Sequence, residues 1–147
     1  MTALKGIRVL DFSTSGPGNF ATMVLGDLGA DVILIGPPGA SDVRVSASSY
    51  AEGEGGEAYQ WSMGNVLNVL SESLNRNKRS MTLNLKTTEG RNIFYELAKS
   101  ADVILDGFRP GVTERLGVDY QTIKKMNPFR EERGSGGQFG YRPLSLR

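Results

Sequence analysis

Apolar residues near the start of the chain follow two spacings, which predict a strand, a helix and a second strand. Residues 7–11, IRVLD, form a short β-branched run typical of a buried strand. Gly29 stands where a helix could end in a left-handed conformation, and the apolar run DVILI follows at 31–35. Between the two runs, apolar residues recur as on one face of a helix: Phe20, Ala21, Val24, Leu25 and Leu28. This order is that of a βαβ unit.

A second unit of the same kind is predicted further along the chain. Residues 80–85 alternate apolar and polar positions, as a strand does. Thr87 or Thr88 can cap the helix that follows. The run DVILD at 102–106 then predicts another buried strand. The helical spacing between them is carried by Ile93, Phe94, Leu97, Ala98 and Ala101.

Two βαβ units whose strands are apolar on both faces predict an α/β fold with a Rossmann-like, doubly wound and mostly parallel sheet. Two short helical segments are expected after the second unit, around 112–116 and 120–126. In such sheets ligands bind beyond the carboxyl ends of the strands. Those ends are rich in Gly or Pro or adjoin cationic side chains, and they fall at 12–18, 36–39, 86–88 and 107–111.

Three segments lack this regular pattern. Residues 36–58 are dominated by Gly, Pro, Ser and Glu and are predicted to form a long loop, whereas 59–70 are predicted to form a helix. Residues 129–147 contain no apolar run that could offset the entropy cost of ordering them. We therefore predict one domain at 1–128 and a divergent, disordered tail at 129–147.

The amino-acid composition restricts the possible chemistry more than it restricts the possible folds. The 147 residues are enough for one domain, and a net charge of +1 gives no bulk attraction to nucleic acids or membranes. The chain has no cysteine and no histidine, which excludes thiolate chemistry and removes the commonest general base and metal ligand. The start of the chain does not resemble a signal peptide, and no apolar run approaches the roughly 20 residues that span a bilayer. We expect a cytoplasmic protein without a metal site.

Two loop motifs each allow a ligand interpretation and a structural one. Residues 13–18, STSGPG, lie between a strand and a helix start, where backbone N–H groups can hold an anion. Taken alone, the motif is better explained as an ordinary turn with a proline that enters the helix. It is not G-x-G-x-x-G, so the dinucleotide fingerprint is absent. Residues 75–79, NRNKR, concentrate three cations that either bind several phosphates or form a solvated connection before an edge strand.

A third motif combines an aromatic ring with a guanidinium group. Phe108 and Arg109 follow the strand predicted at 102–106, where they could hold a purine ring and a phosphate, or form an exposed turn. Lys86 stands at the end of another strand, and Arg115 follows shortly after Arg109. These residues are the candidate binding groups.

The aspartates offer no acid–base pair, because none are spaced as a dyad. We interpret Asp31 and Asp102 as structural residues at strand starts. Asp11 lies at the ligand end of the first strand, so a role in ligand binding is kept as an alternative for this residue. No catalytic residue is predicted in this chain.

Taken together and in this order, four segments resemble the class III CoA-transferases. They are LKGIRVLDFS…GP, LGDLGADVI, NRNKRSMTLNLKTTEGR and LAKSADVIL…FRPGVTERLGVDY, at 4–17, 25–33, 75–91 and 97–120. The family includes formyl-CoA and carnitine CoA-transferases, and α-methylacyl-CoA racemase is similar. The resemblance covers 1–128.

The resemblance implies a Rossmann-like domain that binds coenzyme A, with acyl-CoA as substrate, in a homodimer of interlocked chains. Family enzymes use an aspartate nucleophile that attacks the thioester and forms anhydride and thioester intermediates. The binding energy of the CoA moiety holds the thioester in place. The family's CoA contacts fall on positions at the predicted strand ends: Ser15, Leu83, Asn84, Lys86, Gly107, Phe108, Arg109 and Arg115.

The chain departs from the family pattern in three regions. The stretch 39–72 is longer than in the shorter members of the family. Where the family has a lysine, an acidic residue and a further cation after the second strand, this chain has Leu34, Gly36 and Pro37. From position 129 the family's apolar strand, glycine-rich turn and catalytic aspartate are replaced, so we expect a truncated copy that is inactive alone. A racemase fragment and a non-catalytic CoA- or nucleotide-binding module are the alternatives. An NAD site is poorly supported without the dinucleotide fingerprint.

Overall fold

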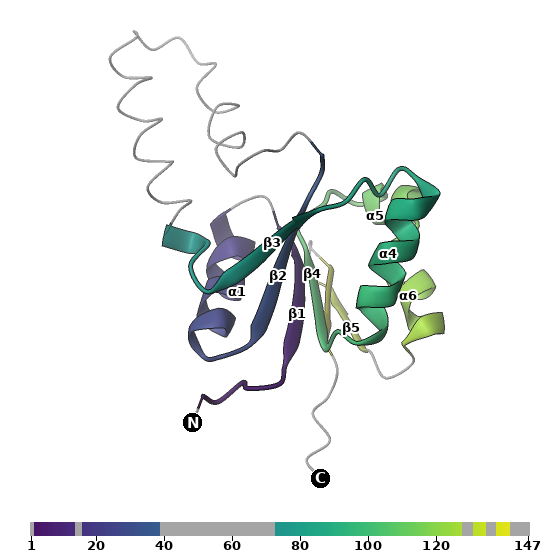
Figure 1. Ribbon diagram of the computed structural model, residues 1–147. Coiled ribbons are helices and arrows are strands. Elements are labelled where there is room, and N and C mark those ends of the chain that lie inside the picture. Colours follow the sequence, from purple (N-terminus) through teal and green to yellow (C-terminus); the bar gives the residue numbers. More distant parts are fainter. Residues whose placement is uncertain (1, 14–15, 39–72, 128–130, 135–137, 142–147) are drawn as a thin grey trace, which may run out of the picture.

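The described part of the chain folds around one six-stranded sheet (Figure 1). The computed structural model describes residues 2–13, 16–38, 73–127, 131–134 and 138–141. The strands lie in the order β3-β2-β1-β4-β6-β5, and β3, β2, β1 and β4 are mutually parallel. The strand bounds are β1 Arg8–Phe12, β2 Asp31–Gly36, β3 Lys78–Thr82, β4 Val103–Asp106, β5 Glu131–Gly134 and β6 Gln138–Tyr141.

Helices cover both faces of the parallel strands, which confirms the predicted doubly wound α/β fold. Figure 1 shows α1 (Gly16–Asp27) on one side of the sheet, with α4 (Thr88–Lys99) and α6 (Tyr120–Met126) on the other. Along β1, Val9 belongs to the smaller core cluster and Leu10 to the larger one, as the alternation of side chains in a strand requires. The larger cluster surrounds Phe94 of α4, which is fully buried.

The α1 helix forms where predicted, but only part of its predicted apolar face packs on the sheet. Three large apolar residues of that face are exposed: Phe20 (56%), Val24 and Leu28. Leu25, by contrast, packs against the smaller core cluster. The buried positions of α1 include Asn19 and Thr22, which pair with polar groups beneath the helix. The apolar spacing therefore identified the helix correctly but only part of its buried face.

The helix ends follow the sequence signals closely. Gly29 has a φ of +97° directly after α1, which confirms the left-handed position expected there. Thr87 caps α4, because its Oγ1 accepts a hydrogen bond from the Gly90 N–H at 3.1 Å. The strand predicted at 80–85 runs instead over 78–82. Leu83 and Leu85 are buried although they follow the strand, so the apolar alternation continued into the turn.

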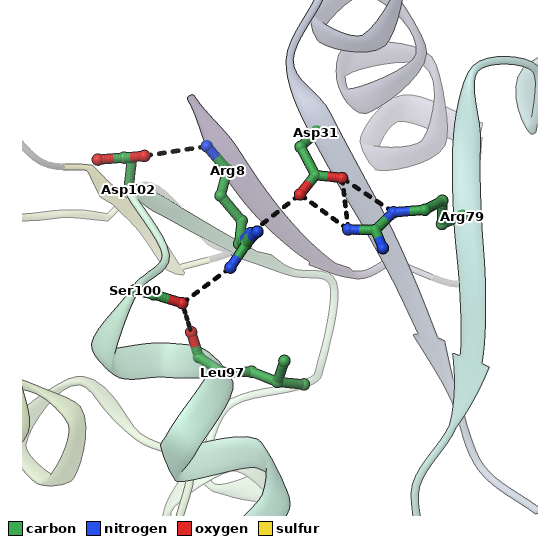
Figure 2. Close-up of polar contacts among 6 residues, drawn as sticks. All are labelled: Arg8, Asp31, Arg79, Leu97, Ser100 and Asp102. Atoms are coloured by element: carbon green, nitrogen blue, oxygen red, sulfur yellow. Dashed lines mark hydrogen bonds and ion pairs between the residues drawn. The ribbon is translucent and has the colours of Figure 1, made fainter. Parts of the chain in front are cut away.

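A polar cluster ties three strands together at the amino ends of β1 and β2 (Figure 2). Asp31 accepts hydrogen bonds from Arg8 at 2.9 Å and from Arg79 at 2.6 Å. The Asp102 carboxylate accepts from the Arg8 backbone N–H at 2.9 Å. Partial burial acts to raise the pKa of Asp31, but the hydrogen bonds from Arg79 and Arg8 outweigh it and lower that pKa. The structural roles predicted for Asp31 and Asp102 are confirmed.

The tail differs from the prediction of disorder. Residues 131–134 and 138–141 form β5 and β6, and β6 pairs antiparallel with β4. Backbone hydrogen bonds to the free edge of β4 explain this pairing, because they require no apolar run in the added strand. The remainder of 129–147, the helix predicted at 59–70 and most of the loop predicted at 36–58 lie outside the described residues. Among the helices that are described, none has the length and apolarity to cross a membrane.

Candidate functional site

The direction of the chain reverses across the sheet between β1 and β4. From β1 the chain passes through α1 to β2, whereas β3 leads through α4 on the opposite face to β4. Ligands of doubly wound sheets bind at such a switch point, beyond the carboxyl ends of the strands. The segment after β1 and the loop after β4 are in contact there, because a Cβ built on Gly107 would lie 3.8 Å from the Ser13 Cα. This edge is the candidate site.

Three cationic side chains of this region are exposed and make no ion pair or hydrogen bond with the described residues. Lys86 follows β3, Arg109 follows β4, and Arg115 lies on the short helix α5, Val112–Leu116. Arg76 and Arg79 differ, because each pairs with a carboxylate, on Asp27 and Asp31 respectively. Unpaired cations at a ligand edge are free to bind phosphate.

Arg91 contacts two parts of the candidate site, namely the loop that carries Lys86 and the end of α5. Its Nη1 donates to the carbonyl oxygens of Leu85 and Lys86, at 3.2 and 3.1 Å. A Cβ built on Gly117, directly after α5, would lie 3.6 Å from the Arg91 Cδ. The Lys86 loop and the α5 helix, which carries Arg115, are therefore neighbours. Sequence reasoning missed Arg91, although an arginine one turn into a helix is well placed to bind carbonyl groups of the preceding loop.

The turn between β3 and α4 packs closely against the first turn of α4. A methyl group added at Gly90 would overlap the backbone carbonyl oxygen of Asn84. Asn84 is exposed, and its Oδ1 accepts a hydrogen bond from the Lys86 N–H at 3.1 Å. Leu83 is 7% exposed and belongs to the core, so its side chain faces away from any ligand. The turn presents Lys86 and Asn84 to solvent on a fixed backbone.

Phe108 belongs partly to the core. Its ring centroid lies 6.2 Å from that of Phe12, which meets Phe94 edge-on at 5.3 Å. Its backbone N–H donates to the Asp106 carboxylate at 3.1 Å. The aromatic packing therefore sets the course of the loop from which Arg109 and the exposed Gly107 face solvent.

Asp106 is the last residue of β4 and directly precedes the loop 107–111. Burial raises the pKa of Asp106, the Phe108 N–H opposes the rise, and nearby Glu114 adds to it. A carboxyl group with a raised folded-state pKa contributes stability that is complete below its unfolded pKa and is lost as the pH rises through the folded value. Within the described residues, no group of three or more acidic side chains is arranged to hold a metal ion.

Asp11 does not face the ligand edge, so the role left open for it is resolved. It is fully buried, and its carboxylate accepts hydrogen bonds from Ser13 and Thr22. Lys78 reaches the same carboxylate, with its Nζ 3.3 Å from Oδ2 and its side chain only 1% exposed. Burial lowers the pKa of Lys78, and the charge and hydrogen bond of Asp11 oppose the shift. Because Arg76, Lys78 and Arg79 all have carboxylate partners, the structural interpretation of 75–79 is favoured over phosphate binding.

The described geometry thus brings several predicted residues to one edge of the sheet. Gly107, Phe108 and Arg109 leave β4, and Arg115 follows on α5. Asn84 and Lys86 leave β3. Ser15 lies outside the described residues.

Residues 4–129 match the family described as CoA-transferase family III. The chain belongs to that family. The resemblance drawn from the four sequence segments is thereby confirmed. The family match ends where the chain was predicted to depart from the family pattern, at position 129.

Two similar proteins and one solved structure support this assignment to the family. A protein of Fusarium pseudograminearum (strain CS3096) named acyl-CoA transferase is 40% identical over 129 residues, which are 86% of this chain and 27% of that protein. A succinyl-CoA:mesaconate CoA-transferase of Haloarcula marismortui is 38% identical over 128 residues, covering 87% of this chain and 30% of the relative. The crystal structure of a hypothetical protein from Mycobacterium tuberculosis superposes with a TM-score of 0.66 at 34% identity, covering 87% of this chain and 31% of that one.

The chain therefore spans less than a third of the length of each of these three proteins. The matched residues of this chain, 4–129, contain the four parallel strands and the loops at their carboxyl ends.

Proposed function

We propose that this domain holds the CoA moiety of an acyl-CoA substrate at the carboxyl edge of its parallel sheet. The observation that carries the proposal is the group of three exposed cations, Lys86, Arg109 and Arg115, which lack partners among the described residues. CoA carries several phosphate groups, and charge-assisted hydrogen bonds to phosphate are among the stronger polar contacts in proteins.

The remaining predicted residues would complete the site around these cations. Asn84 offers its side chain beside Lys86 and Gly107 leaves room for backbone contact, while Phe108 and Arg109 would flank the adenine ring. Leu83 would contribute through its backbone alone, since its side chain is buried. Ser15, which lies outside the described residues, remains a proposed contact through its hydroxyl group.

We further propose that the reaction served is CoA transfer from an acyl-CoA to a carboxylate. The curated relatives described above are named as transferases, which favours transfer over racemisation. The described residues offer no catalytic pair, so we assign to this chain substrate binding and expect no transfer by it alone. A cytoplasmic location and a homodimer stay predictions.

Isothermal titration calorimetry with CoA tests the binding proposal. We expect saturable binding by the unmodified chain and a dissociation constant about tenfold higher for each of K86A, R109A and R115A, because each removes one charge-assisted contact. K125A, which removes an exposed lysine from α6, is the matched control and should bind like the unmodified chain. No heat up to about 1 mM CoA, or equal loss in K125A, would contradict the proposal. CoA transfer from succinyl-CoA by the chain alone would contradict the assignment of binding without catalysis.

A further inference from the structure

A buried polar cluster lies directly beneath the turn between β1 and α1. We call it the Asp11 network, and it consists of Asp11, Ser13, Asn19, Thr22 and Lys78. Asp11 and Thr22 are fully buried, and Ser13 and Asn19 are 4% and 3% exposed. The members come from the end of β1, the turn after it, α1 and the start of β3.

Hydrogen bonds from three different segments converge on the Asp11 carboxylate. Ser13 donates its backbone N–H at 2.8 Å and also its hydroxyl, and Thr22 donates its hydroxyl from α1. The Lys78 Nζ donates at 3.3 Å from β3, and it also donates to the Asn19 carbonyl oxygen at 3.0 Å. One side chain therefore fixes the first residue of the turn relative to the helix and the sheet.

Ser13 is also held sterically by the first turn of α1. A Cβ on Gly18, in the first turn of α1, would overlap the Ser13 side chain. Ser13 is thus held between Asp11 below it and the α1 backbone beside it. Its neighbour across the sheet edge is Gly107, in the loop that carries Arg109.

Stability alone is a weak reason for such a cluster. Burying an ion pair costs desolvation energy that its attraction often only offsets, and an apolar pair of similar size frequently serves folding equally well. A converging set of hydrogen bonds does what an apolar pair cannot, because its directionality specifies one backbone position. The location supports the same interpretation, since the network lies under the ligand edge rather than at the centre of either apolar cluster.

We propose that the Asp11 network positions Ser13 and the first turn of α1 beside the candidate site, with Asp11 and Lys78 acting as positioning residues that do not themselves contact the ligand. This inference rests on the proposed CoA site, which Ser13 adjoins through its close approach to Gly107. Preorganising a binding loop increases affinity, because less order has to be imposed when the ligand binds.

The test is a double variant, D11L/K78M, which replaces the buried ion pair with apolar side chains and leaves no unpaired charge. The matched control is D27N/R76Q, which removes a nearby exposed ion pair, the one between Asp27 of α1 and Arg76 of the segment before β3. Two quantities are measured at a temperature where each protein is folded. They are the amide hydrogen exchange at Ser13, Gly16, Gly18 and Asn19, and the CoA dissociation constant.

We expect exchange at these amides to be at least about tenfold faster in D11L/K78M, and its CoA dissociation constant to be about tenfold higher. The control should match the unmodified protein in both measurements. Unchanged exchange and unchanged affinity in folded D11L/K78M would overturn the inference.

If the unmodified chain binds no CoA, the proposed function fails, and the exchange rates alone decide whether the network positions Ser13 and the first turn of α1. If D11L/K78M does not fold, S13A provides the second variant. It keeps the ion pair and removes only the hydroxyl link between Asp11 and the turn. S13A should show faster exchange in the same amides, and exchange like that of the unmodified protein would overturn the inference.

Discussion

The variant D11A should lower the free energy of unfolding by about 3–5 kcal/mol, the largest effect that we expect from a single substitution in this chain. The substitution leaves the Lys78 ammonium group buried without its carboxylate, because the lysine side chain is only 1% exposed. It also removes the acceptor of the buried Ser13 and Thr22 hydroxyl groups. Urea unfolding followed by circular dichroism measures the loss by linear extrapolation.

Two companion variants separate this explanation from a general effect of losing an aspartate. D27A removes a carboxylate whose partner, Arg76, is half exposed, and it should unfold close to the unmodified protein. D11A/K78M should recover much of the stability lost in D11A, because it removes the unpaired charge. A loss below about 1 kcal/mol in D11A would contradict the buried ion pair.

The second large effect is expected from F94A, which should cost about 3–5 kcal/mol. Phe94 is fully buried on α4, and its ring packs against Phe12 at 5.3 Å and Tyr95 at 5.8 Å. Truncation to alanine would leave a cavity where β1 and α4 meet. The same urea titration measures this loss.

The neighbouring residue provides the control for F94A. Ile93 is 49% exposed on the same helix, so I93A should change stability by no more than about 0.5 kcal/mol. F94L keeps much of the buried volume and should fall between the two. Equal effects of F94A and I93A would contradict the burial of Phe94 and the exposure of Ile93.

The sequence predicted most of the regular elements because their signals are local. Thr87 and Gly29 mark a helix start and a helix end through the backbone groups that they satisfy, and both act as predicted. The parallel arrangement followed from strands apolar on both faces, which only a doubly covered sheet can bury. These inferences need no knowledge of distant contacts.

What the sequence could not predict depends on contacts between distant segments. Lys78 lies 67 positions from Asp11, and no local pattern distinguishes its buried ammonium group from the paired, exposed Arg79 beside it. The apolar spacing of α1 likewise included Phe20, Val24 and Leu28, which proved to be exposed, because polar contacts with Asp11 help to determine which side of the helix meets the sheet. The pairing of β6 with β4 depends on backbone groups, which carry no side-chain pattern.

The candidate site was predicted in its location and only partly in its composition. Strand ends are recognisable from glycine, proline and cations, so the edge with Lys86 and Arg109 was found from the sequence. The buried side chain of Leu83 and the carbonyl contacts of Arg91 needed the structure, because both depend on how the turn packs against α4.

The most direct test of the central claim is to map CoA onto the folded chain by NMR chemical-shift changes. We predict shifts for the backbone amides of 83–87, 107–109, Gly111 and Ser13, which all follow the carboxyl ends of the strands. The amides of Arg8, Asp31 and Asp102, at the amino ends, should not move. Shifts confined to the amino ends, or the absence of any shift under saturating CoA, would contradict the placement of the CoA site.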